Sequence, residues 1–190
     1  MVDSLPSYAQ VYSGKRFQGT QFHIFNYGLS NHSWRVCTAT SSKPLLKYYS
    51  VTGHESAVLC LGDETRVGSM QRRTLKGQPP RYLVELKLPY NFHAFQDIVF
   101  LLDPLPIMEC SDVDGELLRF HWLRHGSFTN KQVLIRLDEP EKIIATFQPS
   151  LIPTKVGSVS FSSTMGDQEM CLILMFLTFS LYARQMAQLR

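Results

Sequence analysis

Basic residues are the residues whose type and spacing in this sequence most directly suggest binding chemistry. Arg66, Arg72, Arg73, Lys76 and Arg81 fall within one polar stretch of the chain. An arginine fork can hold two phosphate oxygens at once, and a lysine adds a mobile positive charge. Such a stretch is a candidate site for an inositol phosphate headgroup or an anionic membrane surface, at about 1 kcal/mol per basic residue. The alternative interpretation, which the sequence alone favours, is a solvated loop whose charges keep the protein soluble.

Two other patterns resemble metal sites. His121 and His125 have a spacing that on a helix would place two ligands on one face. The surrounding residues indicate a strand, in which four residues span about 13 Å, so we expect solvent-facing histidines and no metal. The segment from Asp112 to Glu116 is similar to part of a calcium loop, but the residues after it suit a strand. We therefore expect a hairpin turn there.

Catalytic motifs are not evident in the sequence. It contains neither a Gly-x-Ser-x-Gly elbow nor a Gly-x-x-x-x-Gly-Lys phosphate loop. The cysteines lie far apart, which excludes a knuckle-type zinc site and a disulfide-dense scaffold; they are Cys37, Cys60, Cys110 and Cys171. We expect no cofactor, no metal and no enzymatic activity, and an inert buried thiol at Cys171.

Length and composition indicate a folded protein with a real core. The chain has 190 residues, of which 44% are hydrophobic and 18% are charged, and this excludes a disordered chain. The net charge of +3 is too small to identify a nucleic-acid-binding protein, and we expect no nucleic acid partner. The N-terminus lacks the basic start and apolar centre of a secretory signal. We expect an intracellular protein, cytoplasmic or peripherally bound to a membrane, and not a secreted one.

The segment Met170–Tyr182 is apolar on every side, so a helix there must be enclosed by protein or by lipid. It is about 20 Å long, whereas a bilayer core needs about 20 residues, or roughly 30 Å. Extending it would place Arg184 in hydrocarbon. We therefore favour a central helix over about residues 168–187, with a membrane span as the alternative; its expected core residues are Leu172, Leu174, Phe176 and Phe179.

The chain before this helix shows almost only short strand patterns separated by turn residues. The expected strands are Thr20–Asn26, Ser33–Ala39, Leu45–Val51, Ala57–Leu61, Thr65–Ser69, Arg81–Leu88, Asp97–Leu102, Ile107–Cys110, Leu117–Leu123, Lys131–Leu137, Ile143–Gln148 and Val156–Ser162. The stretch Gln71–Pro80 is expected to be a loop. We predict a mainly β protein: a flexible tail over 1–13, then a single domain over 14–190. About twelve antiparallel strands close into a β-barrel that removes exposed edges and encloses the hydrophobic C-terminal helix.

This order of elements resembles the Tubby C-terminal-like superfamily, which includes the tubby proteins, the plant LURP-one-related proteins and the phospholipid scramblases. The closest similarity is to a fungal domain of unknown function in that group. It lies within about Asp112–Arg190 and rests on a series of matching segments: Asp114-Gly115, Phe120-His121-Trp122, the strand Lys131–Leu137, Ile144-Ala145-Thr146-Phe147, and the helix Leu172–Tyr182 followed by Arg184. The resemblance implies a β-barrel around a buried helix, and phosphoinositide binding or membrane association. The calcium-site and cysteine-rich signatures of scramblases have no counterpart here.

The preferred functional hypothesis is a non-catalytic, Tubby-like binding module that recognises anionic lipid headgroups or a protein partner. One alternative is a membrane-associated, scramblase-like protein anchored by its C-terminal hydrophobic segment. A second alternative is a barrel that carries a small ligand or acts as an enzyme, which requires open space inside the barrel.

Overall fold

A computed structural model describes most of the chain. It covers residues 21–26, 33–51, 56–73, 81–88, 92–102, 106–125, 130–162 and 165–188, without the side chains of residues 51, 187 and 188. The tail predicted over 1–13 lies outside these residues.

Twelve strands and one long helix make up the described fold. The strands are β1 (Gln21–Asn26), β2 (Trp34–Thr38), β3 (Pro44–Val51), β4 (Ser56–Leu61), β5 (Arg66–Arg73), β6 (Arg81–Leu86), β7 (Gln96–Leu101), β8 (Ile107–Ser111), β9 (Leu117–Arg124), β10 (Gln132–Arg136), β11 (Ile143–Pro149) and β12 (Lys155–Phe161), and the helix is α2 (Asp167–Gln188). Most bounds lie within two residues of the expected ones. β5 is longer than expected, so Gln71–Arg73, predicted to be loop, belong to a strand.

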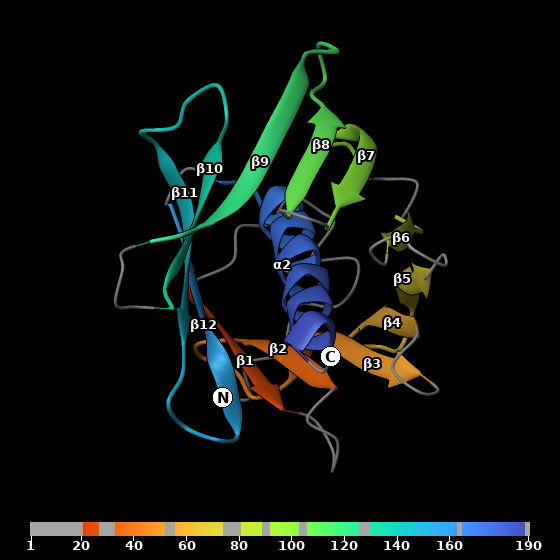
Figure 1. The fold of residues 1–190 in the computed structure, drawn as a ribbon, viewed down its shortest axis with the longest axis vertical. Helices are drawn as coiled ribbons and strands as arrows, with labels where there is room; N and C mark the ends of the chain where they lie inside the picture. The colour runs from red at the N-terminus through yellow and green to blue at the C-terminus, as the bar shows by residue number, and fades with distance from the viewer. Residues whose placement is uncertain are drawn as a thin grey trace, which may run out of the picture.

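All twelve strands form one antiparallel sheet that curls into a nearly closed barrel. The order is β6-β5-β4-β3-β2-β1-β12-β11-β10-β9-β8-β7, so the pairing of β1 with β12 joins the two halves of the chain. β6 and β7 are the two ends of this order. Figure 1 shows the strands arranged around α2, with β10–β12 on one side and β5 and β6 on the other. The predicted fold class is confirmed.

The helix α2 lies inside the barrel because its sequence leaves no polar face to expose. Every residue from Met170 to Ser180 is buried, including Leu172, Leu174, Phe176 and Phe179, which are fully enclosed. The helix begins after Gly166, whose N–H donates to the Glu169 carboxylate at 2.7 Å, and this contact satisfies one free donor of the first turn. No described helix meets the length and hydropathy needed to cross a bilayer.

Aromatic side chains join α2 to the strands. The rings of Phe179 and Tyr48 lie 6.0 Å apart, and those of Phe176 and Phe100 lie 5.1 Å apart. Asp167 is buried in the first turn of α2, and two hydroxyl residues are buried in the middle of the helix. Their hydroxyls donate to carbonyl oxygens of the preceding turn, Thr178 to Leu174 and Ser180 to Phe176, both at 2.7 Å. Because these groups are satisfied within the helix, they do not weaken the apolar core.

Candidate functional site

The two rims of the barrel carry very different charge. Neighbouring strands are antiparallel, so hairpin turns alternate between the rim where α2 begins and the rim where it ends. The rim where α2 begins carries most described acids, and we call it the acidic rim; they are Asp63, Glu64, Asp97, Asp112, Asp114, Glu116, Asp138, Glu139, Glu141, Asp167 and Glu169. The other described acids, Glu85 and Glu109, lie within β6 and β8.

The rim where α2 ends, which we call the basic rim, carries basic side chains and none of the described acids. These basic residues are Arg35, Arg72, Arg73, Arg81, Arg124, Lys131, Lys155 and Arg184. The ion pairs found among the described residues lie at the acidic rim or toward it, for example Arg119 with Glu109 at 2.8 Å and Lys142 with Glu139 at 3.2 Å. Among the described residues, charge is therefore compensated at one rim and predominantly positive at the other.

The basic residues predicted to form one site are divided by the strands that carry them. Arg66 begins β5 and Arg73 ends it, so Arg66 lies at the acidic rim, about 23 Å along the strand. Arg72, Arg73 and Arg81 lie at the basic rim. Lys76 is outside the described residues. Only three described residues of this sequence cluster therefore lie together, at the basic rim. Arg66 is separated from them by the length of β5.

Arg72 and Arg73 point to opposite faces of β5. Arg72 shares the inner face with Met70, which is 1% exposed, and it lies close enough to Tyr182 of α2 to act on the charge of that phenol. Arg73 is exposed on the outer face, directly opposite Arg81 of β6 in the pairing register. Like charges placed opposite each other repel, so an anion between Arg73 and Arg81 would be stabilising.

The β11–β12 hairpin presents apolar side chains at the basic rim. Leu151 is fully exposed, with a relative accessibility of 102%, and Ile152 is 59% exposed. The turn itself is well held: the Ile152 N–H donates to the Ser150 hydroxyl and the Lys155 N–H to the Ile152 carbonyl, both at 3.0 Å. We call Leu151 and Ile152 the apolar tip. It is a defined turn that keeps two large apolar side chains in solvent.

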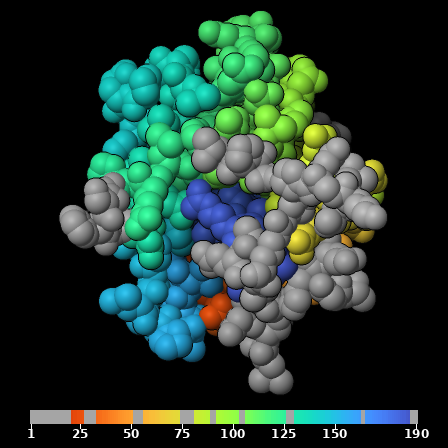
Figure 2. Space-filling model, in the orientation of Figure 1, coloured from red at the N-terminus to blue at the C-terminus, as the bar shows by residue number. Residues whose placement is uncertain are grey.

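A pocket of about 530 Å³ lies between the last turns of α2 and the strands β9–β12 and β1–β2. Its lining combines polar and apolar side chains. The described lining residues are Asn26, Trp34, Arg124, Asn130, Gln132, Phe147, Pro149, Val156, Leu181, Arg184 and Gln185. The wall contains two arginines and no described acid. Figure 2 shows atoms of α2 at the centre of one face of the molecule, between strands of both halves of the chain.

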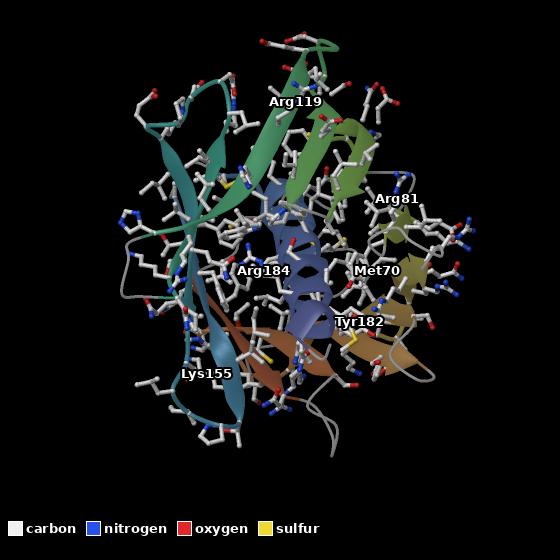
Figure 3. The ribbon with its side chains drawn as sticks, in the orientation of Figure 1. Met70, Arg81, Arg119, Lys155, Tyr182 and Arg184 are labelled. Atoms are coloured by element: carbon white, nitrogen blue, oxygen red, sulfur yellow. The ribbon has the colours of Figure 1, made fainter. Side chains whose placement is uncertain are left out.

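The helix directs different side chains to the two sides of the barrel. Figure 3 shows Arg184 and Tyr182 on opposite sides of α2, as expected for residues about 200° apart on a helix. Tyr182 lies near β3, where its hydroxyl is 3.4 Å from that of Ser50. Arg184 faces the pocket, and burial lowers the pKa of its guanidinium. Burial therefore partly desolvates its charge, and no ion pair with a described residue compensates it.

One histidine prediction is wrong. His121 is only 7% exposed, because its register partners on β8 and β10 are the apolar residues Ile107 and Ile135. Burial, and then the charge of Arg184, lower the pKa of this imidazole. The described residues contain no group of three or more histidine, cysteine or acidic side chains that could hold a metal ion.

The predicted hairpin turn at Asp112 is confirmed. The Asp112 carboxylate accepts hydrogen bonds from the N–H groups of Asp114 and Glu116, at 2.9 and 2.8 Å. Gly115 adopts a positive φ of 82°, which this turn requires.

Arg124, Gln132 and Arg184 could not be recognised as a group from the sequence. Nothing in their spacing joins them, because two come from neighbouring strands and the third from the helix. The one available signal was a single arginine directly after a wholly apolar run. Comparison of the chain with family models, curated proteins and solved structures finds no match.

Proposed function

We propose that this protein is a non-catalytic binding module that docks on anionic membranes through its basic rim. The observation that carries the proposal is the concentration of basic side chains at one rim, where none of the described acids lies. Each basic residue held near an anionic leaflet contributes about 1 kcal/mol, so several acting together give measurable binding. The acidic rim is repelled by the same surface and orients the molecule with its basic rim toward lipid.

Arg73 and Arg81 are the residues of the predicted cluster that best fit a headgroup. They face solvent and oppose each other in register, and neither has an ion pair with a described residue. A phosphate between them would accept hydrogen bonds from both guanidiniums and remove their mutual repulsion. A phosphorylated inositol headgroup is the ligand class that we propose, at the cytoplasmic face of a membrane.

The apolar tip supports the same orientation. Leu151 and Ile152 lie at the basic rim beside Lys155. An anionic membrane that attracts the basic side chains would therefore also contact these two apolar side chains. The anchored, scramblase-like alternative is less well supported, because the segment that would enter the membrane is buried among the strands. Membership of the Tubby-like superfamily is part of the proposal, supported by the order of twelve antiparallel strands and a C-terminal helix within a nearly closed barrel.

Vesicle co-sedimentation tests the proposal. Vesicles of phosphatidylcholine alone are compared with vesicles that also contain phosphatidylserine or phosphatidylinositol bisphosphate at matched charge. We expect binding only to the anionic vesicles, strongest with the inositol lipid. Equal, negligible pelleting on all three overturns the proposal, and so does equal binding to neutral and anionic lipid.

A matched pair of double variants tests the rim itself. Arg73→Gln with Arg81→Gln removes two charges from the basic rim, and Lys43→Gln with Lys87→Gln removes two exposed charges from the other end of the barrel. The net charge is the same in both variants. We expect the first to weaken vesicle binding about 30-fold and the second to leave it nearly unchanged. Equal weakening would mean that overall charge, and not the rim, drives binding.

A further inference from the structure

The pocket beside α2 is lined by a residue with an unsatisfied polar atom, which points to a ligand. Gln132 is only 6% exposed, and its Oε1 atom is buried with no hydrogen-bond partner among the described residues. Buried amide oxygens in folded proteins nearly always accept a hydrogen bond. Gln132 lines the pocket, so a rotation of its side-chain amide would present this oxygen to a donor brought by a bound molecule.

The charges that line the pocket indicate that its ligand is an anion. Arg124 and Gln132 are direct partners in the register of β9 and β10, so their side chains share the inner face of the sheet. Arg184 approaches the same space from α2, on the side that Figure 3 shows facing β10–β12. A guanidinium that is partly buried without a counter-ion is costly, and an anionic ligand would remove that cost.

The pocket also has an apolar and aromatic part of its wall, beside the polar residues Asn26, Asn130 and Gln185. Trp34 is 4% exposed and Phe147 is 2% exposed, and Val156 and Leu181 complete this part of the lining. The Phe147 ring lies over Gly157 of β12, which is in register with Pro149: a Cβ atom at Gly157 would lie 2.4 Å from this ring. A volume of about 530 Å³ lies within the usual range of small-molecule sites, so the pocket can hold an apolar body as well as a charged group.

We infer that this pocket binds a small organic anion with an apolar body, whose carboxylate, sulfonate or phosphate lies against Arg184 and Arg124 and whose N–H or O–H donates to Gln132. This function goes beyond membrane docking, because the ligand enters the barrel wall as a single molecule and needs no bilayer. The proposed membrane contacts use Arg73, Arg81 and the apolar tip, none of which lines the pocket.

Fluorescence titration with two matched dyes tests this inference. Anilinonaphthalene sulfonate carries an anionic group, an aromatic body and one N–H, and N-phenylnaphthylamine has the same rings and N–H without the sulfonate. We expect saturable binding of the anionic dye at one site, at least tenfold tighter than that of the neutral dye. We also expect it to quench Trp34, an effect that Trp34→Phe reduces. Equal affinities for the two dyes overturn the inference.

Two variants locate the binding. Arg184→Gln should lower the affinity for the anionic dye at least tenfold and leave the affinity for the neutral dye unchanged. Gln132→Glu places a carboxylate opposite Arg124, so it should abolish binding of the anionic dye while keeping or raising the melting temperature. This second variant decides the question if Arg184→Gln folds poorly. Unchanged dye affinity in Gln132→Glu overturns the inference.

The control separates the two proposals. Arg73→Gln with Arg81→Gln should keep full dye affinity, because these residues lie outside the pocket. A loss of dye binding in this control would overturn the assignment to the pocket. If the wild-type protein binds the dye but no vesicles, the ligand pocket is supported and the proposed membrane function is wrong.

Discussion

Replacing Leu151 by alanine is expected to weaken membrane binding without changing the stability of the fold. Leu151 is fully exposed, so its side chain makes no contribution to the core that alanine would remove. The substitution deletes three carbon groups, and each is worth about 0.8 kcal/mol when it moves from water into an apolar phase. Full insertion of the Leu151 side chain therefore predicts a loss of about 2.4 kcal/mol, or about 60-fold in the vesicle partition coefficient.

The matched control is Leu137→Ala. Leu137 follows β10 at the acidic rim and is 43% exposed, so this variant makes the same chemical change on the side of the barrel that should face away from lipid. Partition is measured by co-sedimentation with phosphatidylserine vesicles, and stability by urea unfolding. We expect Leu151→Ala alone to lose binding, with the free energy of unfolding unchanged within about 0.5 kcal/mol. Equal partition of Leu151→Ala and wild type would refute the role of the tip.

A label at the tip gives an independent measurement. The cysteines Cys37, Cys60, Cys110 and Cys171 are all buried. Burial, and then the charge of Asp112, raise the pKa of the Cys110 thiol to about 12, so this thiol stays protonated. A Leu151→Cys variant should therefore react selectively with a polarity-sensitive dye. Its emission should shift to shorter wavelength on anionic vesicles, and an unshifted spectrum with protein bound would show that the tip stays in water.

Three further predictions concern the fold. Leu174→Asp should yield insoluble protein on expression, because the buried charge at this fully enclosed position has no partner; a soluble variant that melts cooperatively would contradict the buried helix. Gly157→Ala should cost about 1–3 kcal/mol in urea unfolding, since its Cβ would lie 2.4 Å from the Phe147 ring and 2.7 Å from the Gln148 carbonyl; unchanged stability would contradict that contact. His121 has a lowered pKa in the folded state, so the unfolded state binds more protons and stability should fall as the pH drops below about 6.5. His121→Leu should flatten this dependence in urea unfolding across that range, and an unchanged slope would assign it to other groups.

Local sequence patterns were enough to predict the elements of this fold. The alternation in β9 and the wholly apolar character of α2 are properties of neighbouring residues, and both elements lie where they were expected. The curling of the sheet around the helix also followed, because an apolar helix segment without a polar face needs to be enclosed. The barrel is only nearly closed, with β6 and β7 as the two ends of the strand order, so the predicted removal of exposed edges is not complete.

The site was harder to predict because it depends on pairing between distant segments. Arg66 and Arg73 are close in sequence, but one extended strand carries them to opposite rims. Arg124 and Gln132 meet through the register of β9 and β10, and Arg184 reaches them only because α2 runs back through the barrel. The exposure of His121 was predicted wrongly for a related reason. Alternation along one strand shows which face a side chain is on, but not whether that face is covered.

The position of α2 in the chain has a consequence for how the protein is made. All twelve strands precede this helix, and β12, which joins the two halves of the sheet through β1, comes just before it. During translation the strands emerge with their inward-facing apolar residues uncovered, and they stay so until the helix leaves the ribosome. Nascent chains stalled before α2 should therefore need chaperones that shield apolar surface. Chains long enough to expose α2 outside the ribosome should no longer need them.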